Sequence, residues 1–170
     1  MKNKIFLFSL ILTVMIAFSG CSSTGFGNED IMQPPKPTGD KAQIQQIVEN
    51  KTSRNYSLVY PQKGDNRSAI IVKDLTGHGD DEAIALYRVG GDSTKTHVLF
   101  IHKKDSTWVY QSDFIIASTD VERVCFADVN GDGELEILVG YSIFNTAANQ
   151  LYAYFENGKT IQQIKVGDEY

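Results

Sequence analysis

The sequence predicts a mainly β protein in which two four-stranded repeats follow a short amphipathic helix. Three observations support this fold class: a long series of strand-like segments, turn signals between them, and an internal repeat. After residue 53, β-branched and aromatic residues dominate, and Gly-Asp, Lys-Asp-Ser and Asn-Gly turns separate the segments. The predicted strands are 56–60, 68–73, 82–89, 96–103, 107–114, 123–128, 135–141, 150–156 and 160–166.

A short helix is predicted over residues 40–52, ahead of the first strand. Ala42, Ile44, Ile47 and Val48 recur at helical spacing and form one apolar stripe. Asp40 precedes the stripe and is predicted to cap the helix N-terminus. The stripe is narrow, so we expect the helix to be stable only when it packs against the strands.

An internal repeat divides the predicted β domain, residues 53–170. The segment 73–89, KDLTGHGDDEAIALYRV, aligns without gaps with 127–143, ADVNGDGELEILVGYSI, at a spacing of 128 − 74 = 54 residues. Each unit contains a strand, an acidic loop, two more strands, a tight turn and a last strand. A four-stranded unit of this kind is typical of a β-propeller blade, so we expect two blade-like repeats.

The acidic loop of the second repeat has the composition of a calcium site. Its oxygen-bearing side chains fall on alternate positions, and Gly133 permits a sharp turn that lets them converge. An EF-hand would need Glu where Val139 stands and a helix after the loop, so that motif is excluded. A solvated polar turn is the alternative. The predicted Ca²⁺ ligands are Asp128, Asn130, Asp132, Glu136 and, through its backbone carbonyl, Glu134.

This loop resembles the FG-GAP or VCBS repeat, whose motif Asp-x-Asn-x-Asp-Gly-x-x-Asp/Glu joins two strands of a propeller blade. Over about residues 33–160 the chain is also similar to clostridial-type lipoproteins that contain VCBS repeats. The resemblance implies that the motif positions of the second loop ligate calcium. It also implies a propeller-like arrangement of the strands.

The corresponding loop of the first repeat departs from the motif at two positions. Thr76 stands in place of the Asn, and His78 stands in place of the middle Asp. Imidazole is a poor ligand for calcium. We therefore expect this loop to keep its turn and to lose most of its affinity. Its degenerate positions are Asp74, Thr76, His78, Asp80 and Glu82.

The N-terminus has the pattern of an export signal. Lys2 and Lys4 precede an apolar run that ends at Phe18, and residues 1–20 therefore read as a cleaved signal peptide. Residues 18–21, Phe-Ser-Gly-Cys, resemble a bacterial lipobox, which implies that Cys21 is the first residue of the mature protein and carries lipid, including palmitate. Residues 21–39 are rich in Ser, Gly and Pro and are predicted to be a flexible tether. These features predict a protein anchored by lipid on the extracytoplasmic face of a bacterial cell membrane.

Net charge and residue types narrow the classes of function that the sequence supports. The 170 residues carry a net charge of −5, and removal of two lysines with the signal leaves 14 − 21 = −7, which disfavours nucleic acid as a partner. The three histidines do not have metal-site spacing, and no nucleophile or phosphate-loop motif is present, so we expect no catalysis.

We expect a binding or scaffolding role toward a surface protein or polysaccharide. The alternative is an accessory or sensor subunit of a surface enzyme, or a hydrolase. Cys125 is interpreted as a small buried strand residue.

Overall fold

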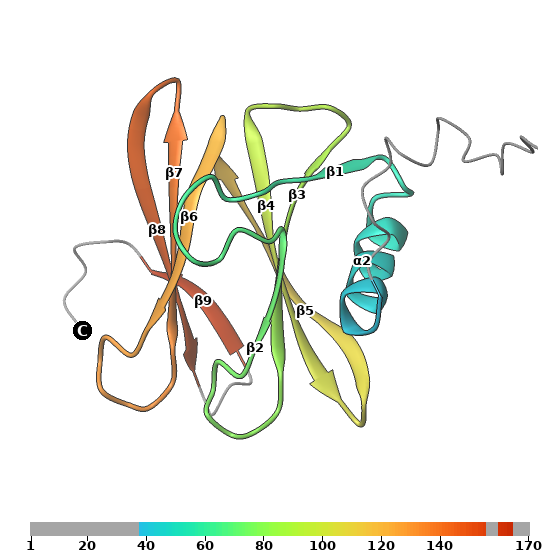
Figure 1. Ribbon diagram of the computed structural model, residues 1–170, viewed down its shortest axis with the longest axis vertical. Coiled ribbons are helices and arrows are strands. Elements are labelled where there is room, and N and C mark those ends of the chain that lie inside the picture. The colour runs from blue at the N-terminus through green and yellow to red at the C-terminus, as the bar shows by residue number, and fades with distance from the viewer. Residues whose placement is uncertain (1–37, 156–159, 165–170) are drawn as a thin grey trace, which may run out of the picture. The chain divides into compact units, whose positions relative to one another are not determined.

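The structure is a computed structural model that describes residues 38–155 and 160–164. These residues form one helix and nine strands, so the prediction of a mainly β fold is confirmed (Figure 1). The elements are α2 (Asp40–Lys51), β1 (Tyr56–Leu58), β2 (Ile70–Lys73), β3 (Glu82–Val89), β4 (Lys95–Lys104), β5 (Thr107–Ala117), β6 (Asp120–Ala127), β7 (Glu136–Ile143), β8 (Thr146–Phe155) and β9 (Thr160–Ile164). The predicted signal peptide, lipidated Cys21 and nearly all of the tether lie outside the described residues.

The strands form two antiparallel sheets. In the first sheet, β1 and β2 both pair with β3, and β4 and β5 follow in order. The first sheet therefore contains five strands rather than the four predicted, because β1 adds to the same edge of β3 as β2. The second sheet has the order β6-β7-β8-β9.

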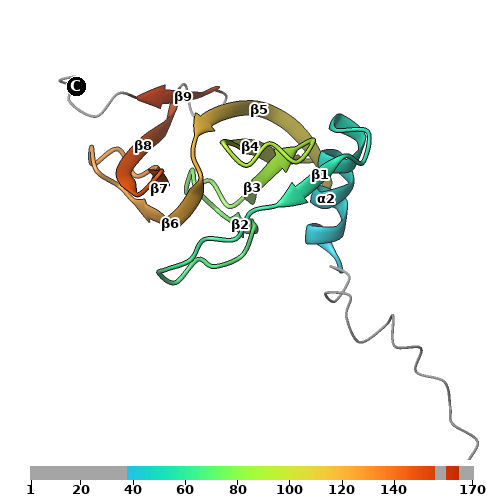
Figure 2. The same cartoon turned by 90° about the horizontal axis from the view of Figure 1, so that it is seen from above.

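The two sheets share one hydrophobic core. Figure 2 shows α2, the first sheet and the second sheet following one another in that order. Burying a large apolar side chain contributes about 1.5–3 kcal/mol, so this core is a main source of stability for both sheets. Its buried members are Val59, Ile71, Leu75, Ile84, Leu86, Val98, Phe100 and Ile116 on one side, and Val121, Val124, Ile137, Val139, Tyr152 and Ile161 on the other.

Helix α2 covers the opposite face of the first sheet. Ile44 and Val48 are completely buried there, in a second core with Ala83 and Ala85 of β3. The helix is thus stabilised by the sheet, as its narrow apolar stripe predicts.

The prediction that Asp40 caps this helix is wrong. Gly39 is the N-cap residue, and no side chain makes a capping hydrogen bond. Instead the Asp40 carboxylate accepts a hydrogen bond from Trp108 Nε1 at 3.0 Å and lies 3.4 Å from Lys103 Nζ. The hydrogen bond from Trp108 lowers the pKa of Asp40. Asp40 therefore ties the start of α2 to β4 and β5.

The connection between β1 and β2 lies along the edge of β6. The backbone N–H groups of Gln62 and Lys63 donate to the carbonyls of Val121 and Glu122 at 3.2 and 2.7 Å. Lys63 Nζ also forms an ion pair with Glu122 at 3.2 Å. The connection thus covers part of a strand edge that would otherwise be open to pairing with another chain.

Cys125 is exposed, so its assignment as a buried residue is wrong. Val124 points into the shared core, and side chains alternate along a strand. Cys125 therefore points to the other face of the second sheet. No described residue of either core lies on that face.

We expect Tyr152→Phe to raise the free energy of unfolding. Tyr152 is completely buried, and its hydroxyl has no hydrogen-bond partner among the described residues. Removing an unsatisfied buried hydroxyl should contribute about 1 kcal/mol or more of stability. Urea unfolding of the wild type and the variant measures the difference.

Tyr87→Phe is the matched control. Tyr87 is equally buried, but its hydroxyl donates to Asp113 at 2.9 Å. Its loss should lower stability by about 1–3 kcal/mol. Equal destabilisation by both substitutions would contradict this account of Tyr152.

Candidate functional site

The two acidic loops lie side by side at one end of the sheets (Figure 1). Residues 74–81 join β2 to β3, and residues 128–135 join β6 to β7. The backbone N–H of Leu135 donates to the carbonyl of Leu75 at 2.7 Å. A Cβ atom on Gly77 would lie 3.3 Å from the carbonyl oxygen of Gly133, so the two loops approach closely at their glycines.

The first aspartate of each loop organises the turn by the same hydrogen bonds. The two carboxylate oxygens of Asp74 accept from the backbone N–H groups of Gly77 and Gly79 at 2.7 and 3.1 Å. Asp128 accepts from the glycines at the same two offsets, at 2.6 and 3.1 Å. All four glycines have a φ between 71° and 91°, a region that strongly favours glycine. The two loops that align in the sequence at a spacing of 54 residues therefore also have the same conformation.

A buried glutamate closes each loop. Glu82 begins β3 and is 5% exposed, and Glu136 begins β7 and is 2% exposed. Each accepts a hydrogen bond from the residue after the first aspartate, Leu75 N at 2.8 Å in one loop and Val129 N at 2.7 Å in the other. Burial raises the pKa of Glu82, and backbone hydrogen bonds to its carboxylate oppose that rise.

The middle of the second loop presents exposed oxygen atoms. Asn130 Oδ1 accepts from the backbone N–H of Asp132 at 2.9 Å, and Asp132 Oδ1 accepts from the backbone N–H of Glu134 at 2.8 Å. Asn130 Nδ2 also donates to Asp132 Oδ2 at 2.9 Å. Burial, followed by the charge of Asp132, raises the pKa of Glu134. These side chains thus fold the loop as successive Asx turns.

The predicted ligands of the second loop supply only oxygen atoms, which is the donor chemistry that Ca²⁺ prefers. In the geometry described, most of these side-chain oxygens accept the loop's own hydrogen bonds. Within residues 38–155 and 160–164, no three His, Cys, Asp or Glu side chains are grouped closely enough to hold a metal ion. The calcium site therefore stays a prediction.

The first loop does not bring its corresponding side chains together. Thr76 is buried, and its hydroxyl lies 3.5 Å from Glu82 Oε1, whereas His78 and Asp80 are exposed. Thr76 therefore contacts the closing glutamate rather than presenting an oxygen at the loop surface. His78 lies near enough to Glu134 of the neighbouring loop to oppose the rise in that residue's pKa.

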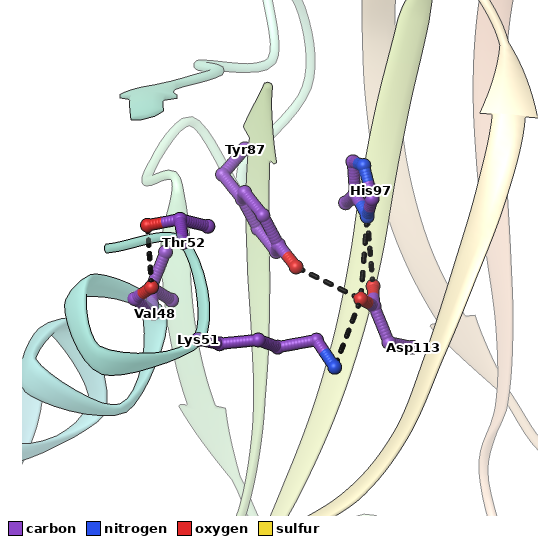
Figure 3. A network of polar contacts seen from close by, with 6 residues as sticks. All are labelled: Val48, Lys51, Thr52, Tyr87, His97 and Asp113. Atoms are coloured by element: carbon purple, nitrogen blue, oxygen red, sulfur yellow. Dashed lines mark hydrogen bonds and ion pairs between the residues drawn. The ribbon is translucent and has the colours of Figure 1, made fainter. Parts of the chain in front are cut away.

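A polar cluster between α2 and the first sheet is not foreseen by the sequence analysis (Figure 3). The carboxylate of Asp113 accepts from Tyr87 Oη at 2.9 Å, and both its oxygens lie 3.2 Å from His97 Nδ1. Lys51 Nζ, at the end of α2, lies 3.4 Å from Asp113 Oδ2. Burial, followed by the bond to Asp113, raises the pKa of Tyr87, so its hydroxyl stays a donor. The signal in the sequence is an acidic residue, Asp113, on a strand and directly before the apolar residues 114–116.

Comparison of the chain with protein-family models, with curated proteins and with solved structures finds no match. Within the part of the chain that the structure describes, no helix is long and apolar enough to span a membrane.

We expect Glu82→Gln to remove one source of pH-dependent stability. The raised pKa means that folded Glu82 binds its proton more tightly than unfolded Glu82 does. Its stabilising contribution is therefore fully present below the ordinary value of 4.5 and is lost as the pH rises through the raised value. Relative to the variant, the wild type should lose stability as the pH increases.

Urea unfolding of both proteins between about pH 4 and pH 8 measures this difference. A difference in unfolding free energy that does not change with pH would contradict a raised pKa at Glu82. A wild type that gains stability relative to the variant at higher pH would contradict it as well.

Proposed function

We propose that the protein is a lipid-anchored, extracytoplasmic binding or scaffolding protein in which calcium stabilises the second acidic loop. The observation that carries the calcium part is the second loop itself. Its first aspartate, its glycines and its buried glutamate share the hydrogen bonds of the first loop, and it adds exposed oxygens at Asn130 and Asp132. The first loop has the same backbone hydrogen bonds but lacks two of the predicted oxygen ligands. It therefore serves as a control for calcium binding within the same protein.

The ligands would be the side chains of Asp128, Asn130, Asp132 and Glu136 together with the carbonyl of Glu134. Bound calcium would supply positive charge among carboxylates that otherwise repel one another. Its role would be structural, because the loop joins two strands of a sheet whose inner face belongs to the shared core. At a calcium concentration 100 times Kd, binding would stabilise the folded protein by about 2.7 kcal/mol.

The blade-like character of the two sheets belongs to the same proposal. Two features support it: the 54-residue spacing and the stacking of one sheet on the other through a common core. A stacked pair of sheets with loops gathered at one end suits the presentation of a binding surface. The partner would be a protein or polysaccharide of the cell surface, held near the membrane by lipid at Cys21.

A calcium titration by calorimetry on residues 22–170 tests the proposal. This fragment contains the compact unit 37–170, and among the described residues the first member of either core is Ile44. We expect one site, together with a higher melting temperature in calcium. Asp132→Ala should abolish both effects because it removes a carboxylate ligand.

The chain offers a matched control, because His78 occupies in the first loop the position of Asp132 in the second. His78→Ala should keep one calcium site, because His78 is not a predicted ligand of the second loop. Conversely, the double substitution Thr76→Asn and His78→Asp gives the first loop the donor pattern of the second, and should add a second site. A wild type that gives neither heat nor stabilisation would exclude the calcium site and leave the loop as a polar turn.

A further inference from the structure

The second acidic loop contains an asparagine followed directly by a glycine, Asn130 and Gly131, and both residues are exposed. A backbone nitrogen can attack the side-chain amide of the residue before it, and glycine hinders this attack least because it has no Cβ atom. The first loop has Thr76 before Gly77 at the corresponding positions, so it lacks the amide. Asn130 is therefore a candidate site of deamidation that has no counterpart in the first repeat.

Deamidation at this site needs only water. Because the lone pair of a peptide nitrogen is delocalised, the Gly131 nitrogen first loses its proton to hydroxide. It then forms a bond to Asn130 Cγ, the bond from Cγ to Nδ2 breaks, and the departing nitrogen takes a proton from water and leaves as ammonia. Water opens the resulting cyclic imide at either carbonyl, which leaves aspartate or isoaspartate at position 130. Overall one water is consumed, one ammonia is released, and nothing is oxidised or reduced.

The folded loop holds the attacking nitrogen in a hydrogen bond. The backbone N–H of Gly131 donates to Asp128 Oδ1 at 2.6 Å. Loss of this proton would place a second negative charge beside the carboxylate, which Coulomb repulsion disfavours. The other carboxylate oxygen accepts from the N–H of Gly133 at 3.1 Å, so Asp128 is itself fixed in place. Asp128 therefore opposes the first step of the reaction.

The side-chain amide of Asn130 is held as well. Its Oδ1 accepts from the backbone N–H of Asp132 at 2.9 Å, and its Nδ2 donates to Asp132 Oδ2 at 2.9 Å. These two bonds fix the torsion angles of the side chain, so a rotation that brings Cγ to bonding distance of the Gly131 nitrogen has to break them. The closed loop thus opposes ring closure in addition to loss of the proton.

We propose that Asn130 is a site of spontaneous deamidation, which the closed loop protects chiefly through Asp128. The reaction takes place when the loop opens, so its rate reports the fraction of time for which the loop is open. This inference goes beyond the binding role and does not depend on calcium or on the lipid anchor.

The product would change the loop permanently. Aspartate at position 130 would add a negative charge between Asp128 and Asp132 and increase the repulsion among the carboxylates. Isoaspartate would insert one more carbon into the backbone ahead of Gly131. The amides of Gly131 and Gly133 would then no longer reach the two oxygens of Asp128 together. The frequency of opening therefore limits the chemical lifetime of the loop.

Peptide mapping by mass spectrometry of residues 22–170, incubated at neutral pH without calcium, tests the proposal. The mapping separates Asn130 from Asn157, which also precedes a glycine and lies outside the described residues. A synthetic peptide of residues 126–136 gives the rate without the fold. We expect Asn130 to react at least about tenfold more slowly in the folded protein than in the peptide. Because calcium is absent throughout, failure of the proposed calcium site would leave this test unchanged.

Asp128→Ala should raise the rate at Asn130 at least about fivefold, because it frees the N–H of Gly131 and opens the turn. Asp74→Ala is the matched control, because it removes the two equivalent hydrogen bonds from the first loop. It should leave the rate at Asn130 within about twofold of the wild type, because the bonds within the second loop are kept. Circular dichroism melting curves check that each variant folds. Should Asp128→Ala fail to fold, Asp128→Asn removes the charge, keeps the size and should still raise the rate.

Three results would overturn the proposal. A folded wild type that reacts as fast as the peptide would mean that the loop gives no protection. A peptide that forms no product would mean that Asn130 is not a deamidation site. Folded Asp128 variants that react at the rate of the wild type, or acceleration of the same size by Asp74→Ala, would exclude Asp128 as the protecting residue.

Discussion

The structure depends on two buried glutamates that stand where the acidic loops meet the central strands. Glu82 and Glu136 are almost fully removed from water, and a buried carboxylate without hydrogen bonds is costly. Each is satisfied by a backbone N–H from the beginning of its own loop. This requirement fixes the distance between the end of one strand and the start of the next. The loop must therefore turn back, and its first aspartate then captures two glycine amides.

The same arrangement connects the two repeats. The loops touch through the hydrogen bond from Leu135 to Leu75, and beyond them the sheets share one core. Because each loop is already held by its aspartate and glutamate, a cation at the second loop would bind to a turn that is largely formed. Such binding loses little conformational entropy. This is the physical reason why a single exposed loop could bind calcium without support from another domain.

Much of the fold could be predicted from the sequence, because local pattern and tertiary packing agree. The nine strands and the helix follow from residue type, spacing and turn chemistry, and the repeat places both loops. The features that were missed depend on which element covers which face. Asp40 is expected to cap a helix, but its carboxylate pairs with Trp108 instead. Cys125 is expected to be buried, but it is exposed on the second sheet. Contacts between side chains far apart in the sequence, such as those around Asp113, cannot be predicted from the local spacing of apolar residues.

Amide hydrogen exchange, measured by NMR on residues 22–170 without calcium, tests most directly whether the buried glutamates hold the loops. The amides of Leu75 and Val129 donate to Glu82 and Glu136, and that of Leu135 joins the two loops. They should exchange slowly, at rates close to those of the β7 amides, because exchange would require the core edge to open. Exchange of these three amides at the rate of an unstructured peptide would contradict the account. It would mean that the loops are not held by their glutamates.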